Sequence, residues 1–106
     1  MTYDHALHLR QITDWYEQVL QQHYPAGPDR GAKELILATH RRVTADAIAD
    51  PTPVTQAAAV QWARAVLILA DAEHDAGRPG WRDEWTDVYE YYVTSNILGP
   101  YAPADS

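Results

Sequence analysis

Five histidines are the residues most able to bind a metal or take part in chemistry in this chain of 106 residues. His74 follows Asp71 by three positions, a spacing that places a carboxylate and an imidazole on one surface of a helix. Helical bundles build metal sites from such pairs on facing helices. If successive helices alternate in direction, His23 lies at the same end of the bundle as His74. The candidate metal ligands are therefore His23, Asp71 and His74.

The same histidines also fit a structural role, as hydrogen-bonded groups near helix ends. A di-iron bundle needs Glu-x-x-His motifs, and the chain has none. It also has no cysteine, and its two serines, Ser95 and Ser106, stand in no Gly-x-Ser-x-Gly elbow. A glycine-rich phosphate loop is missing as well. We therefore predict no catalytic residue and no cofactor, and we rank an enzyme below a binding protein.

Aromatic residues are concentrated between positions 81 and 92, where they alternate with carboxylates. Tryptophan and tyrosine are enriched in protein interfaces, because they bury a large area with little loss of entropy. One helical neighbour cannot cover all of these rings, since they point to several sides of a helix. An acidic and aromatic surface suits a basic protein or a second copy. The predicted partner-binding residues are Trp81, Trp85, Tyr89 and Tyr91.

The stretch over residues 56–76 is the most apolar part of the chain and has helical composition. At about 100° per residue, it carries alanine-rich rows on two nearly opposite sides. The first row is Ala59, Ala63, Val66 and Ala70, and the second is Ala58, Ala65 and Ala72 beside Ile68. Small residues in a row allow a neighbouring helix to approach closely. The first row is expected to pack inside the fold, and the second to need another chain.

Segments with helical periodicity, separated by proline and glycine, predict four helices. Their expected ranges are residues 4–24, 29–49, 53–76 and 81–98. Short connectors favour neighbours that run in opposite directions, so the predicted fold class is all-α, a small antiparallel four-helix bundle. One domain is expected over residues 1–106, with a flexible tail over 99–106.

Local residue choices predict several helix boundaries. Thr52 and Pro53 form a cap followed by a proline at the first helical position. Gly77 is expected to end the third helix, and Asp29 to cap the second. In the first helix, an apolar stripe predicts the core face: Leu9, Ile12, Tyr16 and Val19, with Trp15 and Leu20 beside them.

The second helix carries two apolar faces. Its predicted core stripe is Ala32, Ile36, Thr39 and Val43. Leu37, Thr44 and Ile48 lie on a different side, so the helix contacts a second neighbour or presents this patch to a partner molecule. Together with Tyr91 and the second alanine row, Leu37 and Ile48 leave more apolar surface than four helices easily hide. A homodimer is therefore expected.

The formal charge of −7 is uneven, with −2 over residues 1–53 and −5 over residues 54–106. An acidic chain is poorly suited to a nucleic-acid backbone, whose binding depends on lysine and arginine. The one basic cluster, Thr39–Arg42, precedes an apolar helix unlike a recognition helix. The N-terminus shows no signal-peptide pattern and no apolar run approaches the ~20 residues of a membrane span, so a cytoplasmic location is expected. Seven arginines against one lysine suggest a GC-rich, bacterial coding bias.

Three functional hypotheses follow from these observations. The first is a non-catalytic protein-interaction module that self-associates and serves as a regulator, adaptor or accessory subunit. The second is a small helical enzyme or a ligand- or metal-binding protein. Its pocket would be lined by Trp15, Trp62, Trp85 and Tyr92, with His23, His40 or His74 supplying polar groups. The third is a DNA-binding regulator.

Overall fold

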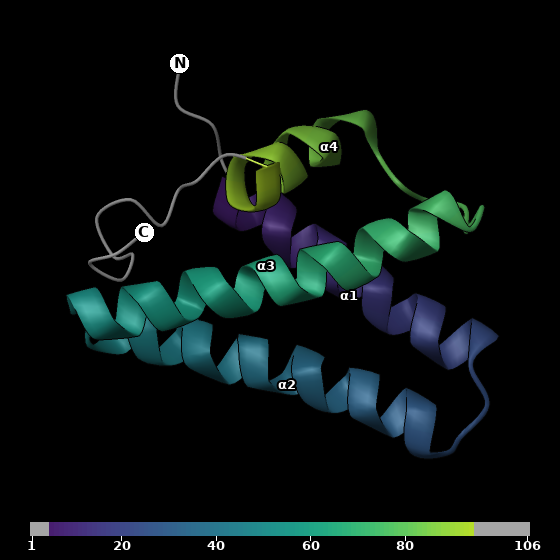
Figure 1. The fold of residues 1–106 in the computed structure, drawn as a ribbon, viewed down its shortest axis with the longest axis horizontal. Coiled ribbons are helices and arrows are strands. Elements are labelled where there is room, and N and C mark those ends of the chain that lie inside the picture. Colours follow the sequence, from purple (N-terminus) through teal and green to yellow (C-terminus); the bar gives the residue numbers. More distant parts are fainter. Residues whose placement is uncertain (1–4, 95–106) are drawn as a thin grey trace.

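The computed structural model describes residues 5–94, which fold into helices with no strand among them. The elements are α1 (His5–His23), α2 (Pro28–Ala49), α3 (Pro53–Asp75), α4 (Asp83–Tyr89) and the π-helix η1 (Glu90–Thr94), which continues α4 (Figure 1). The prediction of a small all-α helical bundle is confirmed.

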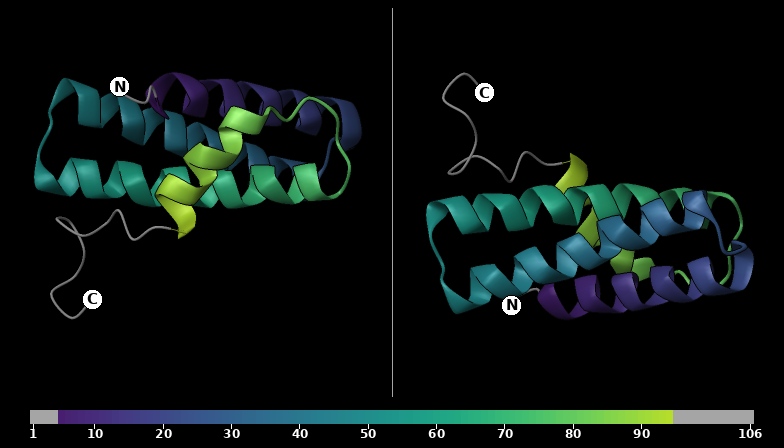
Figure 2. Two further views of the ribbon diagram at one scale, coloured as in Figure 1. Left: turned by 90° about the horizontal axis from the view of Figure 1, so that it is seen from above. Right: turned by 90° about the horizontal axis from the view of Figure 1, so that it is seen from below.

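The three long helices lie lengthwise beside one another, with the α1–α2 connection at one end of the molecule and the α2–α3 connection at the other (Figure 2). The short α4 departs from a regular bundle, because it crosses over α1 and α3 at a steep angle. Of the expected fourth helix, the described part begins at Asp83 and becomes a π-helix at Glu90. The remainder of that helix and the expected tail over residues 99–106 lie outside the described residues.

Capping chemistry sets the start of α3 as predicted. The Thr55 backbone N–H donates to Thr52 Oγ1 at 3.1 Å, and the Thr52 N–H donates to Thr55 Oγ1 at 2.8 Å. This reciprocal pair satisfies two donors that a helix start leaves open, and Pro53 needs none. The start of α2 differs from the prediction, since Gly27 is its cap residue and Asp29 lies in its first turn. Pro28, with its fixed φ, occupies the first helical position instead.

Gly77 ends α3, which confirms the prediction. Its φ of 93° is left-handed, a conformation that glycine adopts without strain. The Gly77 N–H donates to the His74 carbonyl at 3.0 Å, and the Arg78 N–H donates to the Glu73 carbonyl at 3.1 Å. These two bonds form a Schellman motif, which satisfies carbonyls at the helix end.

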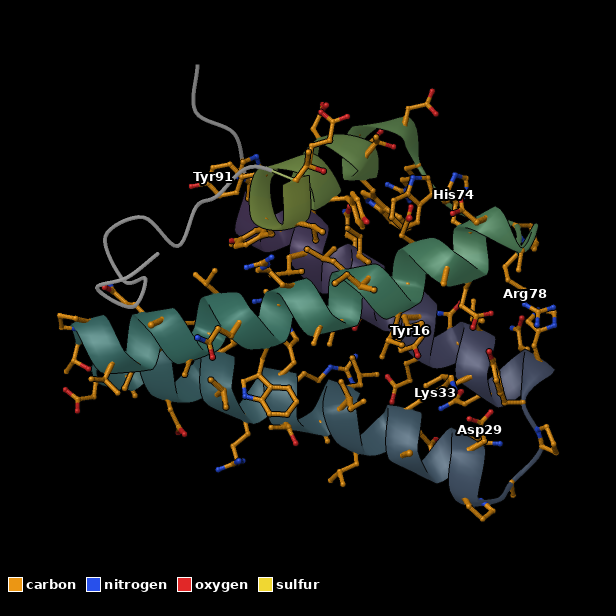
Figure 3. All side chains as sticks on the ribbon, in the orientation of Figure 1. Tyr16, Asp29, Lys33, His74, Arg78 and Tyr91 are labelled. Carbon is orange, nitrogen blue, oxygen red and sulfur yellow. The ribbon has the colours of Figure 1, made fainter. Side chains whose placement is uncertain are left out.

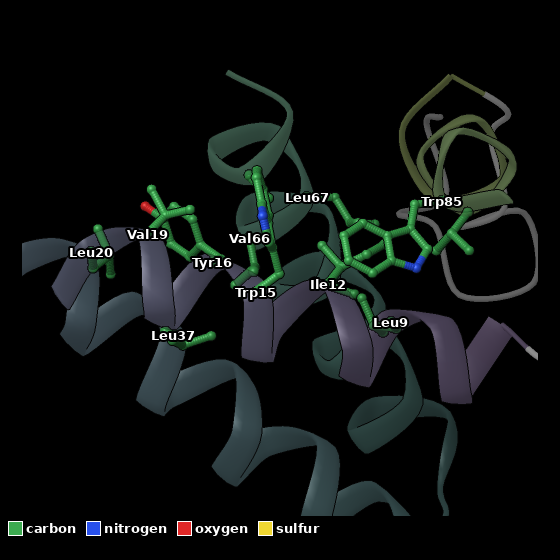
Figure 4. Close-up of a cluster of buried hydrophobic side chains, with 13 residues drawn as sticks. Leu9, Ile12, Trp15, Tyr16, Val19, Leu20, Leu37, Val66, Leu67 and Trp85 are labelled. Atoms are coloured by element: carbon green, nitrogen blue, oxygen red, sulfur yellow. The ribbon is translucent and has the colours of Figure 1, made fainter. Parts of the chain in front are cut away.

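The core forms where the apolar face of α1 meets α3 and α4 (Figure 4). The stripe predicted for α1 is confirmed, since Ile12, Tyr16 and Leu20 are fully buried. From α3, the first small-residue row contributes three buried residues: Ala63, Val66 and Ala70. Small side chains at these positions allow close approach of a neighbouring helix.

α2 packs differently from its predicted stripe, because its buried residues are Leu37 and His40. Leu37 is 3% exposed and belongs to the core, so of the two alternatives for its face the structure favours a second neighbouring helix over a partner molecule at this position. α2 contacts both α1 and α3, and the face that carries Leu37 therefore meets a second neighbour within the chain. Ile48 differs, since it is 77% exposed.

Candidate functional site

The aromatic residues predicted to bind a partner have unequal exposure. Trp85 is 2% exposed, and its indole N–H donates to Gln11 Oε1 at 3.2 Å. Trp81 and Tyr89 are half-buried against the core, whereas Tyr91 is 42% exposed. Trp85 is therefore a core residue and not a surface residue. Its ring connects α4 to α1 through this hydrogen bond. Sequence periodicity places this ring on a core face but cannot show which neighbour covers it.

A cluster of rings joins the 76–82 connector and α4 to the rest of the fold. The ring centroid of Trp81 lies 5.7 Å from that of Trp15 and 5.6 Å from that of Trp85, in edge-to-face contacts. Trp81 also stacks on His74, with centroids 4.8 Å apart. The Trp15 indole N–H donates to the Pro79 carbonyl at 2.8 Å. Such contacts add to the stability that buried area provides, so the cluster anchors α4.

The predicted metal ligands do not form a metal-binding set. His23 is exposed at the end of α1. His74, which lies near the end of α3 (Figure 3), is stacked on Trp81. Burial raises the pKa of the Asp71 carboxyl, and the nearby Asp75 adds to this effect. Within residues 5–94, no group of three histidine, aspartate or glutamate side chains is arranged to hold a metal ion.

A buried carboxylate at the same end of the molecule was not singled out from the sequence. Glu73 is 6% exposed, accepts a hydrogen bond from Arg78 Nε at 3.1 Å and accepts another from the Tyr24 hydroxyl. The bond to Glu73 raises the pKa of Tyr24. Fully buried Tyr16 lies nearby, and burial, aided by the Glu73 charge, raises its pKa. The cluster ties the ends of α1 and α3 together.

A half-open groove of about 380 Å³ lies between α1 and α2. Its lining residues are Ala6, Leu9, Arg10, Thr13, Asp14, His40, Arg41, Thr44, Ala45 and Ile48. Burial lowers the pKa of the His40 imidazole to about 4, and the Arg41 charge adds to this effect. Among the aromatic and histidine residues predicted to line a pocket, only His40 lines this groove.

An uncharged stripe runs along the outward side of α3, and we call it the α3 stripe. It consists of Val54, Ala58, Gln61, Ala65, Ile68 and Ala72, which follow one another by four, three, four, three and four positions. Val54 is 78% exposed and Ile68 49% exposed, whereas Ala58 and Ala65 are half-buried. The sequence indicated the three alanines and Ile68. The heptad spacing itself would have added Val54 and Gln61.

Comparison of the chain with protein-family models, curated proteins and solved structures gave no match. No helix within residues 5–94 has the length and apolar character needed to cross a membrane.

Proposed function

We propose that this chain is a non-catalytic protein-interaction module that self-associates through the α3 stripe. The observation that carries the proposal is an exposed, uncharged row at heptad spacing, on a molecule of net charge −7. Like charges repel two copies of an acidic protein across most of their surfaces. The α3 stripe has no charged residue, so two copies can meet there with the least repulsion. A role as regulator, adaptor or accessory subunit, in a cytoplasmic setting, fits a module of this kind.

The sizes of the side chains in the stripe favour two antiparallel copies of α3. A two-fold axis between Gln61 and Ala65 would place each larger side chain opposite an alanine of the second copy. Val54 would face Ala72, Gln61 would face Ala65, and Ile68 would face Ala58. This pairing of large with small residues allows close packing, and the same patch serves both copies, as a two-fold interface requires.

Charge at the ends of α3 favours the same direction. The N-terminus of a helix carries partial positive charge, and Pro53 begins α3. Asp71 and Asp75 lie near the opposite end of the helix. In an antiparallel pair, the positive end of each α3 would lie beside the acidic end of the other. A parallel pair would bring the acidic ends together, which is unfavourable.

Sedimentation equilibrium over a range of concentrations tests the proposal. We expect the wild-type chain to form dimers and Ile68→Asp to weaken dimerisation by tenfold or more, since it buries a charge in the interface. The control is Leu35→Asp, at an α2 position that is 67% exposed and outside the stripe. This variant should dimerise as the wild type does. A monomeric wild type, or equal effects of the two variants, would overturn the proposal.

A further inference from the structure

We propose that the groove between α1 and α2 binds a small organic monocarboxylate with an apolar body. This site lies on a different side of the fold from the α3 stripe, so the inference stands whether or not the chain dimerises. The groove volume of about 380 Å³ falls within the range of roughly 300–1,000 Å³ that small-molecule sites occupy.

The groove is mostly apolar, and its length suits a compact ligand. Leu9 forms part of its buried floor, and Ala6, Ala45 and Ile48 line its more open part. On each helix the first and last lining residues are eight positions apart, which corresponds to about 12 Å at the rise of an α-helix. A medium-chain acid could lie along this length and cover Ile48, whose side chain is otherwise 77% exposed.

Charge in the groove selects an anion. Two arginines and one aspartate line it, although the chain as a whole is acidic. Arg41 is already held by Asp14 at 3.0 Å and by Glu17 at 3.1 Å, and these pairs fix its position. Arg10 forms no ion pair with any carboxylate of the described residues, so its guanidinium can receive the carboxylate of a ligand.

Two buried polar side chains, His40 and Thr13, lie at the floor of the groove and are held in place by hydrogen-bond partners. His40 is 4% exposed, and its Nδ1 lies 3.5 Å from Thr44 Oγ1. Thr13 is 2% exposed, and its hydroxyl donates to the Arg10 carbonyl at 2.8 Å. A few placed polar groups in an apolar lining are typical of small-molecule sites, where they orient the ligand. Arg10 on the rim and His40 at the floor thus give the ligand its direction.

Titration of the full chain with decanoate, below its micellar concentration, tests the inference by NMR amide shifts. Decan-1-ol shares its apolar chain without the charge, and acetate shares its charge without the chain. We expect saturable shifts at residues 6–14 and 40–48 with decanoate, and binding at least tenfold weaker for the other two probes. Saturable binding elsewhere, no saturable binding, or equal binding of decanoate and either control probe would overturn the inference.

Variants then test the assigned residues. Arg10→Glu should weaken decanoate binding by roughly tenfold or more, because it replaces a charged hydrogen-bond donor with a repelling charge. Arg42→Glu is the matched control, at an exposed α2 position that does not line the groove. Ala45→Trp should fill the groove and abolish binding. Equal affinities of the Arg10 and Arg42 variants would contradict the site even if the Ala45 variant failed to fold.

Discussion

Tyr16 and Tyr24 both lie near Glu73, yet their hydroxyl groups differ in surroundings. The Tyr24 hydroxyl donates to the Glu73 carboxylate, whereas the Tyr16 hydroxyl is buried with no hydrogen-bond partner among residues 5–94. Removing a paired hydroxyl destabilises a fold, and removing a buried unpaired one does not. The two tyrosines therefore separate the contribution of a hydrogen bond from that of a ring.

Tyr24→Phe should lower the free energy of unfolding by about 1–2 kcal/mol, because the bond it removes involves a charged acceptor. Tyr16→Phe should leave stability unchanged or raise it slightly. Urea unfolding of both variants, followed by circular dichroism, measures the two effects. Equal losses of stability would contradict the hydrogen-bond assignment around Glu73.

His40 makes stability depend on pH. Burial lowers its pKa in the folded chain to about 4, whereas the ordinary value is 6.5. Above pH 6.5 the ring is neutral in both states and contributes nothing. As pH falls from 6.5 to 4, the unfolded chain takes up a proton that the folded chain does not, so stability falls. The loss should reach about 3 kcal/mol near pH 4.

The decrease in the free energy of unfolding between pH 6.5 and 4 should be smaller in His40→Gln than in the wild type. The difference between the two decreases is the contribution of the His40 ring. Unfolding free energies measured across that range give the comparison. His23→Gln removes an exposed imidazole and controls for the loss of a histidine in general. If the unfolding free energies of the His40 and His23 variants change with pH by the same amount, His40 is not responsible for the pH dependence.

Residue types alone show only part of the candidate sites. His40 belongs to the predicted pocket, but the residues that surround it come from α1 and α2 and differ from the predicted ring of aromatics. Glu73 reads as one more surface carboxylate in an acidic stretch. Its burial depends on Tyr24 and Arg78, which reach it from 49 and five positions away. Neither the long-range contact with Tyr24 nor the loop contact with Arg78 leaves a periodic pattern in the sequence.

At the scale of the elements, α4 depends on a close backbone approach at Gly80. Its φ of 110° is left-handed, and an added Cβ would lie 2.5 Å from Trp15 Nε1. Trp15 cannot move aside without breaking its bond to the Pro79 carbonyl. The connector therefore needs glycine at this position to seat α4 across α1.

Gly80→Ala should destabilise the fold by about 2 kcal/mol or more, through backbone strain and the clash with Trp15. Gly31→Ala is the control within a helix, since its added methyl group meets no atom within 4 Å. It should raise stability by about 0.5–1 kcal/mol. Thermal unfolding measures both changes. A stabilised or unchanged Gly80 variant would contradict the proposed seating of α4.

Helix positions follow closely from local rules, whereas the path of α4 does not. Thr52, Pro53 and Gly77 set the ends of α3 through backbone chemistry that short stretches of sequence encode. The crossing of α4 depends on how Trp81 and Trp85 meet Trp15, which is distant in the chain. The sequence pattern showed that α2 has two apolar faces. Only the packed structure shows that a neighbouring helix covers Leu37 on the second face.

At the scale of the whole molecule, we propose that two copies meet along the α3 stripe. The molecule is acidic, and the uncharged α3 stripe has the heptad spacing of a helix-packing seam. An antiparallel pair with its axis between Gln61 and Ala65 makes a geometric prediction. Positions near the axis lie close to their own copies, and positions toward the helix ends lie far from them.

The most direct test is thiol cross-linking of single-cysteine variants, since the chain has no other cysteine. With a short bifunctional reagent, Gln61→Cys should give a covalent dimer, because the two copies of this position would lie about 6 Å apart along the helix axis in the proposed antiparallel pair. Ala72→Cys should remain monomeric in the same reaction, because its copies would lie about 27 Å apart along that axis. Efficient cross-linking at both positions would indicate parallel helices, and cross-linking at neither would contradict the α3 interface.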